Sequence, residues 1–145
     1  WVSDRNGYRY STVDPLTAQA WPVMPEVFRE IAQHCALEAG YPNYTPDTCL
    51  INRYAPGAKM SLHQDKDESD LTAPIVSISL GVPATFLFGG LQRSDKTIKL
   101  PVMHGDVVVW GGQSRLNFHG ISPVKTAYHP FWGDQRINIT FRVAG

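Results

Sequence analysis

The chain contains 145 residues, of which 43% are hydrophobic and 18% are charged, and its formal net charge at pH 7 is zero. This length allows one domain with a hydrophobic core and is too short for two. A zero net charge argues against a protein that coats nucleic acid through its overall field, and no apolar run approaches the roughly 18 residues of a membrane span.

We therefore expect a single domain over residues 1–145, without a signal peptide or a membrane segment. The first residue is Trp1 rather than Met, so the natural N-terminus is expected to lie outside this sequence. Residues 1–22 are rich in aromatic and polar side chains, and we predict a substrate lid or an outlying hairpin there. Cys35 and Cys49 form no CxxC pair and are interpreted as reduced, buried thiols of a cytoplasmic protein.

One segment, residues 24–39, has a strong helical pattern. Its apolar positions follow the helical spacing, at Val27, Phe28, Ile31 and Cys35. Pro25 suits the start of a helix, Gly40 suits its end, and Pro42 prevents its continuation. The pattern predicts a helix that braces a sheet.

Short strands punctuated by turns follow from residue 48 onward. We predict strands over residues 48–54, 74–80, 84–88, 97–102, 106–110 and 136–143. Proline- and glycine-containing turns separate them, at residues 56–57, 89–90, 104–106 and 111–112. Many short strands with regular turns predict a mainly β fold, a β-sandwich or jelly roll.

The sharpest chemical signal is the triplet His63-Gln64-Asp65. Residues two apart in an extended chain point to the same side, about 7 Å apart, so the imidazole and the carboxylate can converge on one metal ion. A second histidine from a distant strand would complete the 2-His-1-carboxylate face of non-haem iron(II) oxygenases. The triplet alone is a weak signal, and the residues by themselves favour His119 only slightly over His104.

The C-terminal strand alternates polar and apolar residues. One face carries Arg136, Asn138, Thr140 and Arg142. A strand with its polar face in water would show the same alternation. The two arginines are about 20 Å apart along the backbone, but their guanidinium groups could bend together to hold both ends of a short dicarboxylate. Asn52 and Tyr54 share a face of an earlier strand and offer further polar groups to such a ligand.

Four motifs resemble those of the bacterial AlkB dealkylases: NRYAPG (52–57), HQDKDE (63–68), GDVVVWGG (105–112) and RINITFR (136–142). The order and spacing match, and the resemblance covers nearly the whole chain. It implies a double-stranded β-helix, a jelly-roll variant. It also implies oxidative demethylation or dealkylation of bases such as 1-methyladenine and 3-methylcytosine in single-stranded DNA or RNA, as in DNA repair. Iron(II) would be bound as the metal, and O₂ and 2-oxoglutarate would be consumed as co-substrates, with release of aldehyde, succinate and CO₂.

The resemblance also implies roles for individual residues. The iron ligands would be His63, Asp65 and His119. The end of 2-oxoglutarate nearest the iron would be held by Arg142 and Asn52, and the far carboxylate by Arg136, Asn138 and Tyr54. We expect a monomer that acts in the cytoplasm.

On the substrate side, Trp1 and Tyr8 correspond to aromatic positions that flank a flipped base, with His63 as the opposing wall. Asp67 matches an acidic residue that faces the exocyclic amine of the base, and Arg93 is a candidate contact for a phosphate or the base. Alternatively, Trp1 is a frayed terminus, Asp67 and Glu68 form a solvated acidic turn, and Arg93 contacts neither a phosphate nor the base.

Asn117 departs from the family pattern, which has an aromatic residue two positions before the second histidine ligand, and this leaves the base preference open. Three rival functions remain: a dioxygenase of the same fold that acts on protein or a small molecule, a non-catalytic jelly-roll binding module, and a zinc hydrolase. Trp1, Tyr8 and Asp67 distinguish the AlkB function from the first rival. The complete set of metal and 2-oxoglutarate residues argues against a binding module, and the paired arginines argue against a zinc hydrolase.

Overall fold

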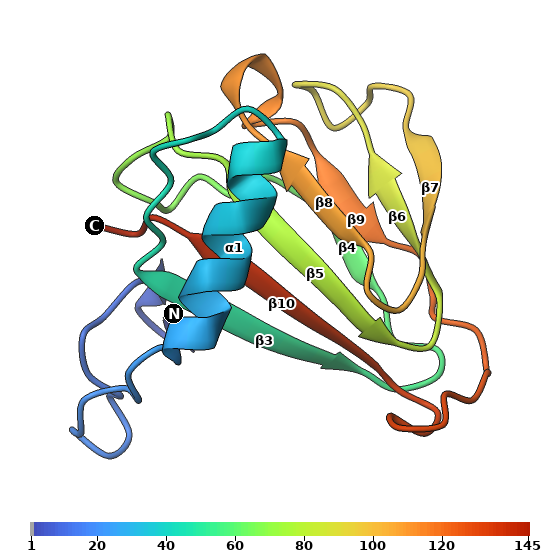
Figure 1. Ribbon diagram of the computed structural model, residues 1–145, viewed down its shortest axis with the longest axis horizontal. Coiled ribbons are helices and arrows are strands. Elements are labelled where there is room, and N and C mark those ends of the chain that lie inside the picture. The colour runs from blue at the N-terminus through green and yellow to red at the C-terminus, as the bar shows by residue number, and fades with distance from the viewer. Residues whose placement is uncertain (1) are drawn as a thin grey trace.

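The fold consists of two four-stranded antiparallel sheets, one helix and a separate two-stranded hairpin, in a computed structural model that describes residues 2–145 (Figure 1). The larger sheet has the strand order β3-β10-β5-β8, and the smaller sheet has the order β4-β9-β6-β7. Neighbours in each sheet are mostly distant in sequence, which is the topology of a jelly roll. The predicted fold class is therefore confirmed.

The bounds of the elements in chain order are β1 (Val2–Asp4), β2 (Gly7–Arg9), α1 (Glu26–Glu38), β3 (Thr48–Tyr54), β4 (Met60–His63), β5 (Ile75–Gly81), β6 (Ala84–Phe88), β7 (Ile98–Val102), β8 (Val107–Trp110), the 3₁₀ turn η1 (Gly112–Ser114), β9 (His119–Ile121) and β10 (Arg136–Arg142). The predicted helix and the six predicted strands are confirmed within one or two residues. The short strands β4 and β9 were not predicted.

The helix α1 packs across the outer face of the larger sheet (Figure 1). Its two fully buried residues, Ala32 and Ala36, are small and let the helix axis approach the sheet closely. Phe28 meets Phe141 of β10 edge to face, with ring centroids 6.2 Å apart. This apolar layer makes α1 the predicted brace.

A second apolar layer fills part of the space between the two sheets. Ile75, Phe86, Trp110 and Ile121 form much of this layer. The larger sheet is thus covered on both faces, and β10 in its centre is buried on both sides. The alternative in which the polar face of β10 lies in water is wrong, because the side chains of that face point between the sheets; Arg136 is only 2% exposed.

The hairpin of β1 and β2 corresponds to one of the two structures predicted for residues 1–22. Its role as a substrate lid stays a prediction, and Trp1 lies outside the described residues. Cys35 and Cys49 are free, as predicted, but half-buried rather than buried. Within residues 2–145, no helix has the length and apolar character needed to cross a membrane.

Candidate active site

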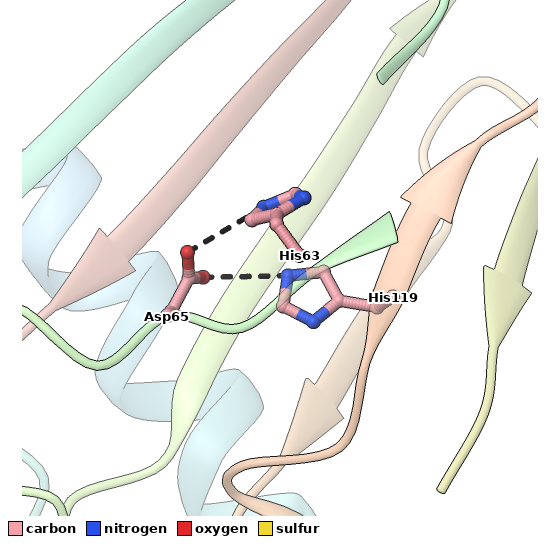
Figure 2. A group of neighbouring side chains, drawn as sticks. All are labelled: His63, Asp65 and His119. Carbon is pink, nitrogen blue, oxygen red and sulfur yellow. Dashed lines mark ion pairs between the residues drawn. The ribbon is translucent and has the colours of Figure 1, made fainter. Parts of the chain in front are cut away.

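Three side chains converge between the sheets: His63 at the end of β4, Asp65 just after it, and His119 on β9 (Figure 2). His63 and His119 are directly paired across the two antiparallel strands. Gly120 allows these strands to approach, since a Cβ at that position would lie 2.6 Å from the backbone oxygen of Met60. The distance from Oδ1 of Asp65 to Nε2 of His63 is 3.6 Å, and from Oδ2 to Nε2 of His119 it is 3.5 Å.

Both histidine rings are oriented by backbone carbonyl groups. Nδ1 of His63 lies 2.8 Å from the carbonyl oxygen of Ser61, and Nδ1 of His119 lies 3.0 Å from that of Asn117. A neutral imidazole that donates from Nδ1 to a carbonyl keeps the lone pair of Nε2 for a metal ion. In both rings Nε2 is the atom that faces Asp65.

Electrostatics favour the charge states that a metal site needs. Burial lowers the pKa of His63, and repulsion from His119 lowers it further, which favours a neutral ring. Burial by itself would raise the pKa of Asp65. The interaction with His119 and the charge of Arg142 outweigh burial and hold the pKa of this carboxyl well below its ordinary value.

The candidate ligand atoms of these three residues all lie within 4.8 Å of one another, and no other such group of three occurs among residues 2–145. Two neutral imidazoles and one carboxylate are the donor set of the facial iron(II) sites, which keep coordination positions open for a co-substrate and O₂. The residues that the sequence singled out therefore form a site that fits iron(II).

The triad lies in the wall of a cavity of about 530 Å³ between the sheets. The polar face of β10 forms another part of the lining, with Arg136, Asn138, Thr140 and Arg142. Asn52 and Tyr54 of β3 also line the cavity, and in the sheet they pair directly with Asn138 and Arg136. The structure thus brings all five predicted 2-oxoglutarate residues into one cavity with the triad.

Arg136 has the strongest features of a receptor for a carboxylate. Its Nη2 donates to Oγ of Ser79 over 2.9 Å, and its guanidinium carbon lies 5.0 Å from the ring centroid of Tyr54. Nε and Nη1 are buried and have no hydrogen-bond partner. Because buried donors without partners are costly, a guanidinium left in this state fits a ligand that brings a carboxylate.

Asn138 is held by its own sheet. Its amide nitrogen donates to Oγ of Ser77 over 2.7 Å and to the carbonyl oxygen of Ile78 over 3.0 Å, while its oxygen accepts from Thr140 over 2.8 Å. The contact of Asn138 with 2-oxoglutarate stays a prediction.

Arg142 contacts protein groups. Its Nη2 donates to Oδ2 of Asp65 over 2.9 Å, its Nη1 lies 3.5 Å from the hydroxyl of Tyr10, and its Nε is 3.4 Å from Oε1 of Glu68. The guanidinium therefore neutralises the carboxylate of the candidate metal ligand. A direct contact of Arg142 with 2-oxoglutarate stays a prediction.

The substrate-side residues differ in their positions. Tyr8 of β2 is 66% exposed and, like the exposed Asp67, contributes to the lining of the cavity. Arg93 donates to the backbone oxygen of Leu62, and its guanidinium carbon lies 4.9 Å from the ring centroid of Phe118. The structure brings Tyr8 and Asp67 to the cavity, but Arg93 is not among its lining residues.

The sequence reasoning missed Arg115, a buried charge beside the triad, and the half-buried Tyr10, which donates a hydrogen bond to Glu68. It also left Glu68 open as part of a solvated turn, an alternative that is wrong because Glu68 is only 7% exposed. Glu68 is the last residue of the HQDKDE motif (63–68), and this position is the signal that could have marked it. No local pattern marks Arg115, which is 3% exposed and is recognised only from its contacts.

His104 and His129 lie outside the triad. The rings of His104 and His129 are 4.3 Å apart, and each Nδ1 accepts a hydrogen bond from a backbone N–H group, that of Gly81 and that of Phe131. Asn117, which departs from the family pattern, donates from its amide to the carbonyl oxygen of Gly89 over 2.8 Å.

Comparisons with known proteins agree with this geometry. The profile of the 2OG-Fe(II) oxygenase superfamily matches residues 1–142. The chain is 61% identical over 145 residues to the alpha-ketoglutarate-dependent dioxygenase AlkB of Escherichia coli (strain K12), covering 100% of this chain and 67% of that protein. It is 31% identical over 160 residues to a DNA N(6)-methyladenine demethylase, ALKBH1C, of Arabidopsis thaliana, covering 92% of this chain and 35% of that protein.

Among solved structures, OsALKBH1 superimposes with a TM-score of 0.80 at 34% sequence identity, covering 92% of this chain and 70% of that one.

Proposed function

The chain belongs to the AlkB family of the 2OG-Fe(II) oxygenase superfamily, and we propose on this basis that its substrates are alkylated bases in single-stranded DNA or RNA. It is a 2-oxoglutarate-dependent dioxygenase, with iron(II) as its metal and 2-oxoglutarate and O₂ as its co-substrates. Its reaction is the oxidative dealkylation of nucleic-acid bases. Lesions such as 1-methyladenine and 3-methylcytosine carry a positive charge, which suits the exposed carboxylate of Asp67 in the cavity lining.

The observation that carries the assignment as a 2-oxoglutarate-dependent dioxygenase is the position of Arg136 in the same cavity as the triad, with two buried donor atoms unpartnered. A dicarboxylate with one end at the metal and the other at Arg136 would satisfy these donors. A zinc hydrolase or a binding module has no need of such a guanidinium.

The residues that line the cavity have different roles in the reaction. His63, Asp65 and His119 would hold the metal on one side and leave its other side open to the cavity. When bound, iron(II) supplies the oxidation of the alkyl carbon at the expense of O₂ and 2-oxoglutarate, giving succinate and CO₂. Because Arg136 and Tyr54 are buried, they would exclude water from the far carboxylate of 2-oxoglutarate. The hydroxylated alkyl group then leaves the base nitrogen as an aldehyde.

Tyr8 and Asp67 are the proposed contacts for the base. A base must leave its stack to enter the cavity, and a tyrosine ring at the mouth offers a stacking surface for it. The exposed carboxylate of Asp67 can accept a hydrogen bond from an exocyclic amine and favours a cationic ring. Arg93 lies beside β4 through its bond to Leu62 and is proposed to meet a phosphate.

The test is the release of succinate and formaldehyde with methylated and unmethylated single-stranded oligonucleotides. We expect methylated DNA or RNA to stimulate both products in equal amounts, whereas the unmethylated oligonucleotide and a methylated peptide do not. Stimulation by the peptide alone would favour the rival that acts on protein.

We further propose that the enzyme is a monomer and acts in the cytoplasm. The two free cysteines support a reducing compartment. Light scattering after size-exclusion chromatography should give a mass near 16.1 kDa for this chain, and a mass twice as large would contradict the monomer.

A further inference from the structure

Arg115, which follows the turn η1, joins both ends of the loop that contains Asp65. Its Nη1 donates to the backbone carbonyl oxygen of Asp65 over 2.6 Å, and its Nε donates to that of Ala73 over 2.9 Å. Its Nη2 donates to Oε2 of Glu68 over 3.1 Å. One buried guanidinium therefore holds the main chain of a candidate metal ligand.

Glu68 lies between two arginines. One oxygen accepts from Arg115, while the other accepts from the hydroxyl of Tyr10 over 2.6 Å and lies 3.4 Å from Nε of Arg142. Its side chain is only 2% exposed. A buried carboxylate is tolerated when it is paired and hydrogen-bonded, and here both oxygens have partners.

These contacts close on Asp65 from two sides. Arg142 holds its carboxylate, Arg115 holds its backbone carbonyl, and Glu68 pairs with both arginines. Two carboxylates and two guanidinium groups balance in charge. The position and the rotamer of one candidate ligand are thus set by a single buried network.

The network also reaches the N-terminal hairpin. Tyr10 follows β2 directly, lines the cavity and bonds to Glu68. Tyr8, the proposed stacking residue, lies two positions earlier in the chain. A shift of the hairpin on binding a base would therefore act on Glu68 and through it on Arg142.

We propose that Arg115 and Glu68 are positioning residues that hold Asp65 in the geometry for the metal, and that Tyr10 couples this network to the substrate hairpin. The second part rests on the proposed nucleic-acid function, whereas the first part needs only the metal site.

The first test measures Mn²⁺ affinity by calorimetry on the purified chain, without nucleic acid. Glu68→Gln, which keeps the shape and removes the charge, and Arg115→Met should each weaken binding at least about 10-fold, the scale for the partners of metal ligands. Arg115→Lys should recover part of the loss. The control is Arg29→Met, which removes a surface ion pair with Glu26 on α1.

Circular dichroism establishes that each variant is folded. If Arg115→Met fails to fold, Glu68→Gln decides the matter by itself. Wild-type Mn²⁺ affinity in a folded Glu68→Gln variant would overturn the positioning role.

The second test is the ratio of succinate released to formaldehyde released with a methylated oligonucleotide. Tyr10→Phe should raise this ratio at least twofold at unchanged Mn²⁺ affinity, because the hairpin is no longer tied to the network. An unchanged ratio would overturn the coupling. If the wild type fails to turn over any methylated oligonucleotide, the proposed function and the coupling fail together, while the Mn²⁺ measurement still decides the positioning role.

Discussion

His63 of β4 lies directly opposite His119 of β9, with their ring centroids 4.4 Å apart. The two residues are distant in sequence and meet because the jelly roll pairs non-consecutive strands. The pairing depends on the close approach that Gly120 permits. Asp65 then needs only the two-residue spacing of an extended chain to reach both rings.

The first prediction concerns the metal. Asp65→Ala should abolish both Fe²⁺ retention and turnover, because it removes a ligand and the negative charge between two imidazoles. Metal content is measured by elemental analysis after dialysis. His104→Ala and His129→Ala are the controls and should retain the metal, since their rings pack against each other away from the triad. Loss of iron in His104→Ala but not in His119→Ala would refute the choice of ligand.

Replacement of Arg136 tests the co-substrate site. Arg136→Met should weaken 2-oxoglutarate binding by about 2 kcal/mol or more, the scale for removing a charged partner of a buried hydrogen-bonded pair. Arg136→Lys should restore it only in part, because an ammonium lacks the planar fork. The Michaelis constant for 2-oxoglutarate is the measurement. Arg53→Met, on the exposed face of the neighbouring strand β3, serves as the control; equal constants in both variants would contradict the assignment.

Arg142 should matter for stability as well as for the co-substrate. Arg142→Ala leaves the buried carboxylates of Asp65 and Glu68 without a shared cation, and the loss of one partner from such a pair costs about 3–5 kcal/mol. Urea unfolding of the metal-free protein gives this free energy. A change of less than about 1 kcal/mol would mean that water reaches the network freely.

Tyr8 should contribute to oligonucleotide binding through stacking. Tyr8→Ala is expected to weaken binding by about 1–3 kcal/mol, whereas Tyr8→Phe, which keeps the ring, should bind nearly as the wild type does. Fluorescence anisotropy with a methylated single strand measures the affinity. Equal weakening in both variants would assign the effect to the hydroxyl group and not to stacking.

Asp67 should determine lesion preference more than affinity. Asp67→Asn removes the charge that favours a cationic base but keeps a similar shape. We expect the ratio of 1-methyladenine to 3-methylcytosine turnover to change while the dissociation constant of the oligonucleotide changes less. Lys66→Met, at the exposed neighbouring position, is the control. An unchanged ratio of 1-methyladenine to 3-methylcytosine turnover in Asp67→Asn would contradict the proposed contact between this carboxylate and the base.

Local sequence patterns predicted much of the secondary structure and part of the metal site of this protein. The helical spacing before Gly40 and the alternation in residues 136–142 predicted α1 and β10, because a helix and a half-buried strand each impose a period on apolar residues. The HxD triplet predicted two ligands of a metal site from the geometry of an extended chain. The resemblance to the AlkB dealkylases, carried by four motifs, indicated His119 and the fold.

Only the tertiary structure decided the rest. Strands β4 and β9 are too short to carry a detectable period, and they exist because β4 pairs with β9 and β9 pairs with β6. Whether the polar face of β10 meets water or a cavity depends on the second sheet, which no local pattern reveals. The same holds for Arg115 and Glu68, whose charges are buried because partners from distant segments satisfy them. Ion pairing between such segments is a property of the folded chain, so the support of the metal site could be found only there.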